Sequence, residues 1–489
     1  MKLPTLVSLV LPALVAADTC ATLASQNPEI TQLKRSDKAF TPTLSYWSAA
    51  CAAQQPSCIL LPKSSSEVST IIRALGTTTE PFAVKSGGHN PNCGFASVAG
   101  GPLVSLQYLN EVAYDAAART VRVGPGNRWH NVSAALQGTG MTVVGGRMGE
   151  VGVGGYMLGG GLSFLSGQYG WAADNVVAYE VVLADGRIVN ATAGQNRELF
   201  AALKGGGNKF GVVTAFTLRA HPQGEVWGGV IAFTGGNTPA MLRAIRDYTE
   251  YNTDAKAGII ATAELTGLNL VDIWILFLFY DAPAPPPGVF ANFTQIPHLL
   301  DTTKRRSYHD LLTFNNGFVL KNQIYTIGTE TTPLPAAEAQ PVMQELYSAW
   351  HTAAASVARV SGVVASLAFQ PLPKSIPAIS TQAGGLVTGW DTAQDRIVLE
   401  LDYSYWYPRD NAAIDGAMNA TIGGLKGVVE RNVAAKVLPE VKLPLFMNDG
   451  YFRQDYWGRI GGGSREKWGR IRRKFDAQGL WSRTGGFAL

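Results

Sequence analysis

Glycine is concentrated in one short segment of this chain. Six of the ten residues from Gly152 to Gly161 are glycine. Because glycine has no Cβ, the backbone N–H groups of such a segment can approach a phosphate closely. A Rossmann fingerprint starting at Gly152 would need a third glycine where Met157 stands, and the Gly-Lys-Ser/Thr of a P-loop is absent. The segment therefore predicts a phosphate-binding loop of another kind, or a glycine turn required only for packing.

A second glycine turn follows a predicted strand nearer the N-terminus. The strand-like segment 81–84 leads into Lys85-Ser86-Gly87-Gly88-His89-Asn90. A histidine after two glycines at a strand end lies on an exposed turn, and neutral imidazole is a good nucleophile and base. His89 is therefore a candidate for chemistry, and the alternative is an ordinary surface or core histidine.

Length and charge limit the class of protein. A chain of 489 residues is expected to form two or more domains. Hydrophobic residues make up 46% and charged residues 16%, which is typical of a packed globular protein rather than a disordered one. The formal net charge of +4 is too small for a dedicated nucleic-acid binder, so no nucleic-acid partner is expected.

The N-terminus has the pattern of a secretory signal peptide. Lys2 precedes the apolar segment 3–15, and Val15-Ala16-Ala17 has the small residues of a cleavage site. We predict that residues 1–17 are removed; the alternative is a buried N-terminal strand. The most apolar later run, 273–279, is short and reads as a buried strand, so no membrane association is expected after cleavage.

Sequons and cysteines fit a secreted protein. Cys20 would begin the mature chain and Cys58 precedes the first strand of the alternating region, so we predict that they form a disulfide that holds the terminus. Cys51 and Cys93 pair or stay free, and without a Cys-x-x-Cys pair no metal site is expected. Four asparagines stand in N-x-S/T glycosylation sequons, namely Asn131, Asn190, Asn292 and Asn419.

The predicted elements divide the chain into three stretches. Helix, strand and glycine turn alternate up to about residue 223, which is α+β in character. Between 224 and 440, strand segments with helices between them suggest one sheet with helices on one face. The strands are expected at 226–233, 259–265, 271–280, 363–369 and 396–405, and the two longest helices at 336–357 and 411–432. Residues 441–489 end with a basic helix.

Five segments, in this order, resemble one known family. They are PFAVKSGGHNPN, VGPGNRWHNV, VGVGGYMLGGGLSFLSGQYGWAADNVVAYEVVLADGRIVNA, LKGGGNKFGVVTAFTL and KFDAQGLW. They resemble the flavoproteins of the vanillyl-alcohol oxidase and p-cresol methylhydroxylase type, and among these the berberine-bridge-enzyme-like oxidases of fungi. The resemblance implies an α+β fold with a two-part FAD-binding domain of p-cresol methylhydroxylase type over 18–223 (core about 54–223). It also implies a substrate domain over 224–440, with an antiparallel sheet covered by helices, and a segment 441–489 that returns to the FAD domain.

The resemblance also implies the residues that hold FAD. The family's histidine in this turn bonds covalently to the 8α carbon of the flavin ring, and here that residue is His89. Val213 would reach the adenine side, Asn448 would lie near the flavin, and Val153 matches a position that governs access of O2, with valine typical of oxidases. The remaining residues implied to bind the cofactor are Lys85, Ser86, Gly87, Gly88, Asn90, Gly152, Gly154 and Gly155.

The sequence departs from the family pattern at three positions. Met148 stands where many relatives have a cysteine that forms a second flavin bond, so FAD is expected to be attached through His89 alone. Tyr156 stands where a histidine is frequent. Asp449 stands where oligosaccharide-oxidising relatives often carry tyrosine. These departures point away from sugars and toward a secondary metabolite.

The function implied is that of a secreted, monomeric FAD oxidase. It would remove a hydride from an alcohol or a related C–H of a small molecule and reduce O2 to H2O2. The alternatives are a flavoprotein oxidase that guides cyclisation in secondary metabolism, an oligosaccharide oxidase, and a secreted glycoprotein that has lost its site.

Alternation along the strand 396–405 suggests a catalytic base. Odd positions from Ile397 to Tyr405 are apolar and share one face, whereas Glu400, Asp402 and Ser404 share the other. The apolar face would pack on the long helices and the polar face would look toward the flavin. We predict Asp402 as the base, with Glu400 possible; the alternative is that these carboxylates face solvent or pair with an arginine. Two further candidates follow the implied flavin-side asparagine, namely Asp449 and Tyr451.

Overall fold

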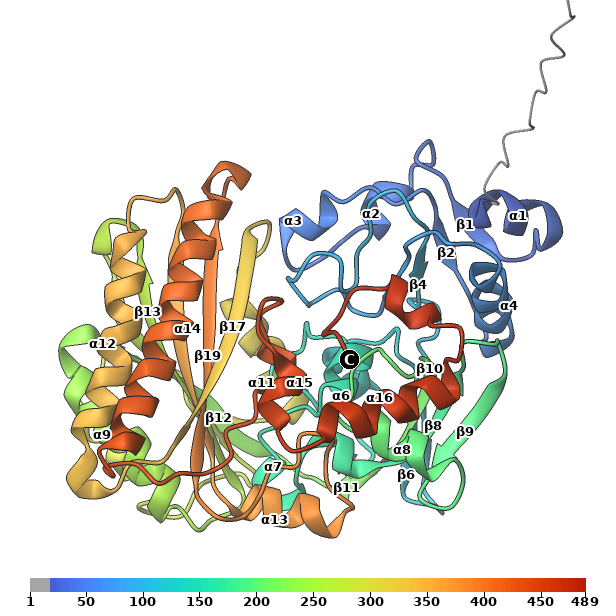
Figure 1. The fold of residues 1–489 in the computed structure, drawn as a ribbon. Coiled ribbons are helices and arrows are strands. Elements are labelled where there is room, and N and C mark those ends of the chain that lie inside the picture. Colours follow the sequence, from blue (N-terminus) through green and yellow to red (C-terminus); the bar gives the residue numbers. More distant parts are fainter. Residues whose placement is uncertain (1–17) are drawn as a thin grey trace, which may run out of the picture.

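The computed structural model describes residues 18–489, drawn in Figure 1. The predicted signal peptide, residues 1–17, lies outside the described residues. Among the described residues, no helix combines the length and apolar character needed to cross a membrane. The architecture is mixed α and β with mostly antiparallel sheets, which confirms the predicted fold class.

The first sheet holds the His89 turn. It has the strand order β1-β2-β4-β3, with β2, β4 and β3 parallel and β1 antiparallel to β2. Helix α4 (Ser65–Gly76) is capped at its N-terminus by Ser64, whose Oγ accepts a hydrogen bond from the Glu67 N–H. The helix buries four apolar side chains at helical spacing. The strands are β1 (Thr31–Leu33), β2 (Ile59–Leu61), β3 (Ala83–Lys85) and β4 (Leu103–Ser105).

The second sheet is antiparallel, in the order β5-β6-β10-β8-β9. Its strands are β5 (Val112–Asp115), β6 (Thr120–Val123), β8 (Val176–Val182), β9 (Ile188–Thr192) and β10 (Val212–Arg219). The predicted hairpin forms, with Gly186 at φ 81° in the turn between β8 and β9. The helices of this region are α5 (Trp129–Ala135), α6 (Val153–Leu158), α7 (Ser166–Tyr169) and α8 (Arg197–Leu203).

The third sheet is large, entirely antiparallel and ordered β15-β12-β14-β13-β18-β19-β17, with β16 also paired to β12. The helices α9 (Thr238–Tyr251), α12 (Pro341–Ser356) and α14 (Asn411–Ala434) cover one of its faces (Figure 1). The strands are β12 (Val226–Thr234), β13 (Ala257–Thr266), β14 (Asp272–Tyr280), β15 (Leu300–Asp301), β16 (Lys304–Arg306), β17 (Ile324–Pro333), β18 (Val364–Leu372) and β19 (Arg396–Tyr405).

Two expectations for this region need correction. The helix predicted from residue 336 begins only at Pro341, because a 3-10 turn comes first and proline occupies the first helical position. The long strand β17 was not predicted, because its sequence, IYTIGTETTP, is rich in threonine and has no apolar run. Its buried hydroxyls are satisfied instead by backbone oxygens: Thr329 donates to Leu399 at 3.0 Å and Thr331 to Pro444 at 2.6 Å.

Residues 441–489 cross from the large sheet to the other half of the molecule. Figure 1 shows the helix α16 (Ser464–Phe475) beside α8, and the short helix α15 (Tyr456–Ile460) packs against α16. The Lys209 ammonium donates to the backbone oxygens of Trp481, Thr484 and Gly485 at 2.9–3.3 Å. The Tyr456 hydroxyl donates to the Gly205 oxygen at 2.7 Å. These bonds fasten the segment to the loop 205–209.

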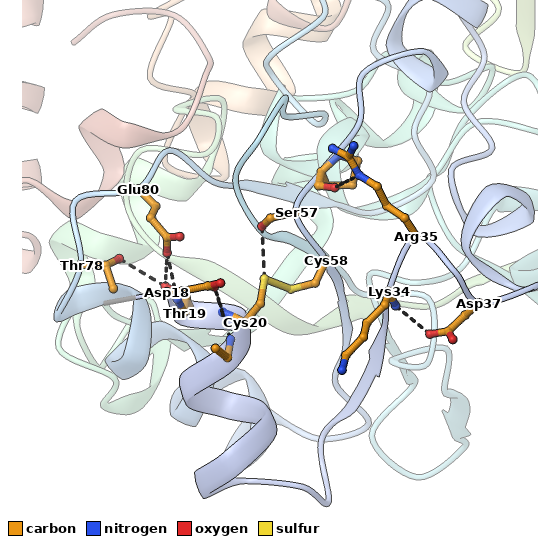
Figure 2. The surroundings of a disulfide bond; sticks show 12 residues. Asp18, Thr19, Cys20, Lys34, Arg35, Asp37, Ser57, Cys58, Thr78 and Glu80 are labelled. Carbon is orange, nitrogen blue, oxygen red and sulfur yellow. Dashed lines mark hydrogen bonds between the residues drawn. A yellow bond between two sulfur atoms is a disulfide. The ribbon is translucent and has the colours of Figure 1, made fainter. Parts of the chain in front are cut away.

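Two disulfides are present. Cys20–Cys58 confirms the predicted pair, and Cys51–Cys93 settles the pairing that the sequence left open. Figure 2 shows the first bond beside the start of helix α1 (Thr19–Gln26), where the Asp18 carboxylate accepts from the Cys20 N–H and the Thr19 N–H donates to Glu80. The Cys20–Cys58 disulfide, the Asp18 cap and the hydrogen bond from Thr19 to Glu80 together hold the first described residues against the first sheet.

Candidate active site

One cavity of about 680 Å³ lies between the glycine turns and the large sheet. This volume is typical of a small-molecule or cofactor pocket. Its lining combines both glycine turns, residues of the segment 441–489, and the uncovered face of β13, β18 and β19. The cavity includes most of the residues that the resemblance assigns to FAD, namely Ser86, Gly87, Gly88, His89, Asn90, Gly152, Gly154, Gly155, Val213 and Asn448.

The two glycine turns meet backbone to backbone. A Cβ added at Gly87 would lie 2.5 Å from the Cα of Gly152, and a Cβ at Gly152 equally close to the Cα of Gly87. The Ser86 Oγ joins the turns, because it accepts from the Gly154 N–H at 3.0 Å and donates to the backbone oxygen of Pro125. Packing is therefore one reason for these glycines.

The same turns also fit the pyrophosphate of a dinucleotide. Gly87 and Gly88 are buried, and their backbone N–H groups donate no hydrogen bond to any described residue. Buried N–H groups almost always have a partner, so a bound anion is the expected acceptor. On the opposite side of the turn, Arg128 donates to the Gly87 oxygen at 2.8 Å. Gly155 faces open space, since a Cβ there would meet nothing within 4 Å.

His89 is held as a neutral imidazole at the wall of the cavity. Its ring stacks on Trp47, with centroids 4.4 Å apart and planes 16° from parallel. Burial, and to a lesser extent the Arg128 charge, lower the pKa of His89 to about 3. The imidazole is therefore uncharged at physiological pH, and its buried Nε2 has no hydrogen-bond partner among residues 18–489. A neutral, unpartnered ring nitrogen is the form that can attack carbon.

Three implied cofactor residues have other surroundings. The Lys85 ammonium donates to the Thr43 oxygen at 3.1 Å and does not line the cavity. Burial, and secondarily Arg128, lower the pKa of Lys85 to about 8. Val153, the first residue of α6, is fully buried in the hydrophobic core and does not line the cavity that its glycine neighbours line. Asn448 does line the cavity, but its amide also bonds the Gly161 N–H and the Tyr156 oxygen.

The alternation predicted for β19 is confirmed. Ile397, Leu399, Leu401, Tyr403 and Tyr405 pack in the core with residues of α12 and α14, whereas Glu400, Asp402 and Ser404 line the cavity. Asp402 pairs with Ser366 of β18, and Ser366 pairs with Glu264 of β13. The Cα atoms of Asp402 and Glu264 are therefore two strand spacings, about 10 Å, apart, and both side chains are on the cavity face. Asp449 completes the cluster from the segment 441–489.

One amide organises part of this cluster. The Nε2 of Gln370 donates to Glu400 at 3.0 Å and to Asp449 at 2.9 Å, while its Oε1 accepts from Arg147. Asp402 is outside this network, and its Oδ1 is buried without a partner among the described residues. Asp402 thus has a buried oxygen to which no described residue donates a hydrogen bond.

Burial raises the pKa of every carboxyl in the cluster. For Asp402 the pKa rises well above the usual range, first through burial and then through Glu400, Asp449 and Glu264. For Asp449 burial and Glu400 raise the pKa, against the hydrogen bond from Gln370 and the charge of Arg147. Burial raises the pKa of Glu264 to about 7. Such shifts are common where proton transfer takes place.

Tyr451 lies outside the cavity lining. Its hydroxyl donates to Asp415 and its ring is buried in the core of the large sheet and its helices. Sequence reasoning missed Glu264, Gln370, Arg147 and the aromatic residues Trp47 and Tyr325, which all line or adjoin the cavity. For Glu264 a signal existed, because Thr262, Glu264 and Thr266 alternate with apolar residues along β13 and share the cavity face.

Comparisons with known proteins identify the family and the fold of the chain. Residues 56–192 match the FAD binding domain family. The chain is 41% identical, over 475 residues, to an uncharacterized FAD-linked oxidoreductase of Arthroderma benhamiae, covering 96% of this chain and 94% of that protein. It is 31% identical over 463 residues to the FAD-dependent monooxygenase drtC of Aspergillus calidoustus, covering 92% and 86%.

Solved structures share the fold. Xylooligosaccharide oxidase from Myceliophthora thermophila superposes with a TM-score of 0.75 and 18% identity over 95% of this chain and 98% of that one. Berberine bridge enzyme from Eschscholzia californica superposes with a TM-score of 0.71 and 18% identity over 96% and 97%. The relatives in sequence, the FAD binding domain and this fold agree, and the chain therefore belongs to the FAD-linked oxidoreductases, with the fold of the berberine-bridge-enzyme-like oxidases.

Proposed function

We propose that the protein is an oxidase that takes a hydride from an alcohol, or a related C–H group of a small molecule, and passes the electrons to O2 to form H2O2. The observation that supports this best is Asp402, which lines the same cavity as the His89 turn and has an oxygen without a hydrogen-bond partner among the described residues. Hydride loss from an alcohol carbon is easier when the hydroxyl proton leaves with it, so a carboxylate here can accept that proton.

FAD, when bound, supplies the hydride acceptor. The N–H groups of Gly87 and Gly88 would hold its pyrophosphate, and His89 would hold the ring through a covalent bond. Met148 lines the cavity where the family's second bond would form, and a thioether cannot make that bond. We therefore propose attachment through His89 alone.

The ionisation of Asp402 sets when it can act as a base. Burial and three neighbouring carboxyls favour its protonated form, so the carboxylate becomes abundant only above the usual pH range of an aspartate. Gln370 engages Glu400 and Asp449, which leaves Asp402 free to contact the substrate hydroxyl. Asp449 remains the second candidate base, because it also lines the cavity.

The rest of the substrate would contact apolar side chains. Ile260, Ile275 and Phe277 come from the same sheet face as the carboxyls, and Phe318 packs edge-on against Phe277 with centroids 5.2 Å apart. An apolar or aromatic body suits this wall better than a sugar. This supports a secondary metabolite over an oligosaccharide.

A second candidate function is oxidation followed by guided cyclisation. The chain is 37% identical, over 286 residues, to a bifunctional solanapyrone synthase of Alternaria solani, covering 58% of this chain. Other relatives are named monooxygenases. A monooxygenase differs from the other two in the fate of O2, because it places one oxygen atom in the product. An oxidase, with or without cyclisation, releases both oxygen atoms as peroxide.

The test is a substrate screen with ¹⁸O2. An oxidase gives one H2O2 per product and no ¹⁸O in a product isolated before exchange with water. ¹⁸O in the product would show a monooxygenase, and a ring-closed product would show the cyclising function. A purified protein without flavin colour would contradict all three functions.

A separate test addresses the flavin bond. The denatured wild-type protein should keep its flavin fluorescence on a gel, and His89→Ala should lose it. Flavin found on any residue other than His89 in a peptide map would overturn attachment through His89 alone.

We also propose that the protein is secreted and glycosylated. Both disulfides suit an oxidising compartment. Each of the four sequon asparagines is exposed, so a glycan could be attached without unfolding; they are Asn131, Asn190, Asn292 and Asn419. Treatment with an N-glycosidase should lower the mass of the secreted protein, and an unchanged mass would contradict glycosylation.

A further inference from the structure

Three aromatic rings form a continuous stack at the edge of the cavity. Trp47 lies between His89 and Tyr325, with ring centroids 4.4 Å and 4.0 Å away and planes tilted by 16° and 26°. His89 belongs to the glycine turn, Tyr325 to β17 of the large sheet, and Trp47 to the loop before the short helix α3 (Ala49–Ala52). The imidazole plane is thus set by a ring from another part of the chain.

The segment that carries Trp47 is itself fastened on both sides. The backbone N–H of Trp47 donates to the Gly88 oxygen at 3.0 Å, which joins this segment to the glycine turn. The Ser48 Oγ accepts from the Tyr325 N–H at 3.1 Å, which joins it to β17. Cys51 is bonded to Cys93, four residues beyond His89. Trp47 therefore cannot move without disturbing the turn, the strand or the disulfide.

We propose that Trp47 is a positioning residue that holds the His89 imidazole in the orientation needed to bond the flavin, and that the Cys51–Cys93 disulfide keeps Trp47 in place. This rests on the proposed attachment through His89. In that step a C–H of the flavin's 8α methyl and the imidazole N–H are lost and a C–N bond forms. The two electrons and two protons pass to the flavin ring, and O2 removes them as H2O2.

The physical reason is the cost of orientation. Bond formation requires the attacking nitrogen to lie near the carbon at a defined angle, and a misplaced group loses rate steeply. An imidazole after two glycines has a flexible backbone on its N-terminal side. Stacking on Trp47 removes the ring's remaining rotation without using either nitrogen, so the nucleophilic lone pair stays available.

The experiment measures the attachment itself rather than activity. Wild type, Trp47→Ala and Trp47→Phe are expressed with riboflavin restricted, purified, and mixed with FAD in air. Total flavin is measured by absorbance, and covalent flavin by the fluorescence that survives denaturation and gel filtration. We expect Trp47→Ala to bind FAD but to attach it at least tenfold more slowly, and Trp47→Phe, which keeps a ring, to attach it within about threefold of the wild-type rate.

The two disulfides supply a matched control. Cys51→Ser with Cys93→Ser should slow attachment. Cys20→Ser with Cys58→Ser removes a disulfide that packs in a hydrophobic cluster without any residue of the stack, and it should leave the rate unchanged. A wild-type rate in Trp47→Ala overturns the proposal. So does equal slowing in Trp47→Ala and in the Cys20/Cys58 variant, because that result shows a general loss of structure. A wild type that binds FAD but never attaches it refutes the His89 bond instead.

Discussion

The contrast between Gly87 and Gly155 separates the two roles of the glycine turns. An alanine Cβ at Gly87 would lie 2.5 Å from the Cα of Gly152. Carbon atoms in contact are about 3.5–4.0 Å apart, so the turns would have to separate by roughly 1 Å or more. That movement would strain the Ser86–Gly154 hydrogen bond of 3.0 Å. Overpacking costs about 1–3 kcal/mol and a lost hydrogen bond about 1 kcal/mol, so Gly87→Ala should destabilise the protein by about 2–4 kcal/mol.

Gly155→Ala should behave in the opposite way. Gly155 lies in α6, and a Cβ there meets nothing within 4 Å. Alanine in a helix is favoured over glycine by up to about 1 kcal/mol, so the fold should be unchanged or slightly more stable. The methyl group would occupy space that we assign to FAD, and an overlap costing about 1–3 kcal/mol would weaken cofactor binding roughly 5- to 150-fold.

Both variants are measured by the same two quantities, the flavin-to-protein absorbance ratio and the melting temperature followed by circular dichroism. Gly87→Ala should lower both. Gly155→Ala should lower the flavin ratio while the melting temperature of the flavin-free fraction matches that of flavin-free wild type. Full flavin content in Gly155→Ala would refute the cradle, and an unchanged melting temperature in Gly87→Ala would refute the close approach of the two turns.

Three further expectations concern the carboxyl cluster and access of O2. Asp402→Asn should slow anaerobic flavin reduction by about 10²–10⁴-fold. In the wild type, the rate of flavin reduction should increase with pH through a pKa above that of an ordinary aspartate. An Asp402→Asn rate within a few-fold of wild type would assign the role of base to Asp449 instead. The pKa of Glu264 is raised from 4.5 to about 7. Ionisation of this carboxyl therefore lowers the free energy of unfolding as pH rises between these values, by up to about 3 kcal/mol above pH 7. Glu264→Gln should therefore raise the melting temperature at pH 8 and leave it unchanged at pH 4, and equal effects at both pH values would contradict the assignment. Val153→Ile adds a methylene to a fully buried site between two cavity-lining glycines. In stopped-flow measurements, reoxidation of the reduced flavin in air should be slowed much more than reduction of the flavin by substrate. Equal slowing of both steps would argue against a role of Val153 in O2 access.

Local patterns predicted the parts of the site that depend on local geometry. Alternation alone placed Asp402 on the correct face of β19, because neighbouring side chains of a strand must point in opposite directions. The Ser86–His89 turn could be recognised because its two glycines and the histidine that follows them are adjacent in the sequence. The Cys20–Cys58 bond was predicted because one cysteine starts the mature chain and the other precedes a strand.

The missing parts depend on which distant segments become neighbours. Glu264 is near Asp402 only because the strand order is β13-β18-β19, and no local pattern fixes that order. Trp47 precedes a four-residue helix and has no periodic context, so its stack on His89 could not be foreseen. Residue type also gave no hint that Lys85 would bond the Thr43 oxygen rather than line the cavity.

The return of residues 441–489 to the first half of the molecule has a consequence for biosynthesis. Phe446, Asn448, Asp449, Trp481 and Phe487 all form part of the cavity wall. A nascent chain emerging from the ribosome will display both glycine turns long before these residues are translated. The cavity wall can therefore be completed around a cofactor only after translation, when residues 441–489 have packed against the first half of the molecule. A protein truncated before Phe446 should therefore contain no bound flavin, even when it is expressed with added riboflavin.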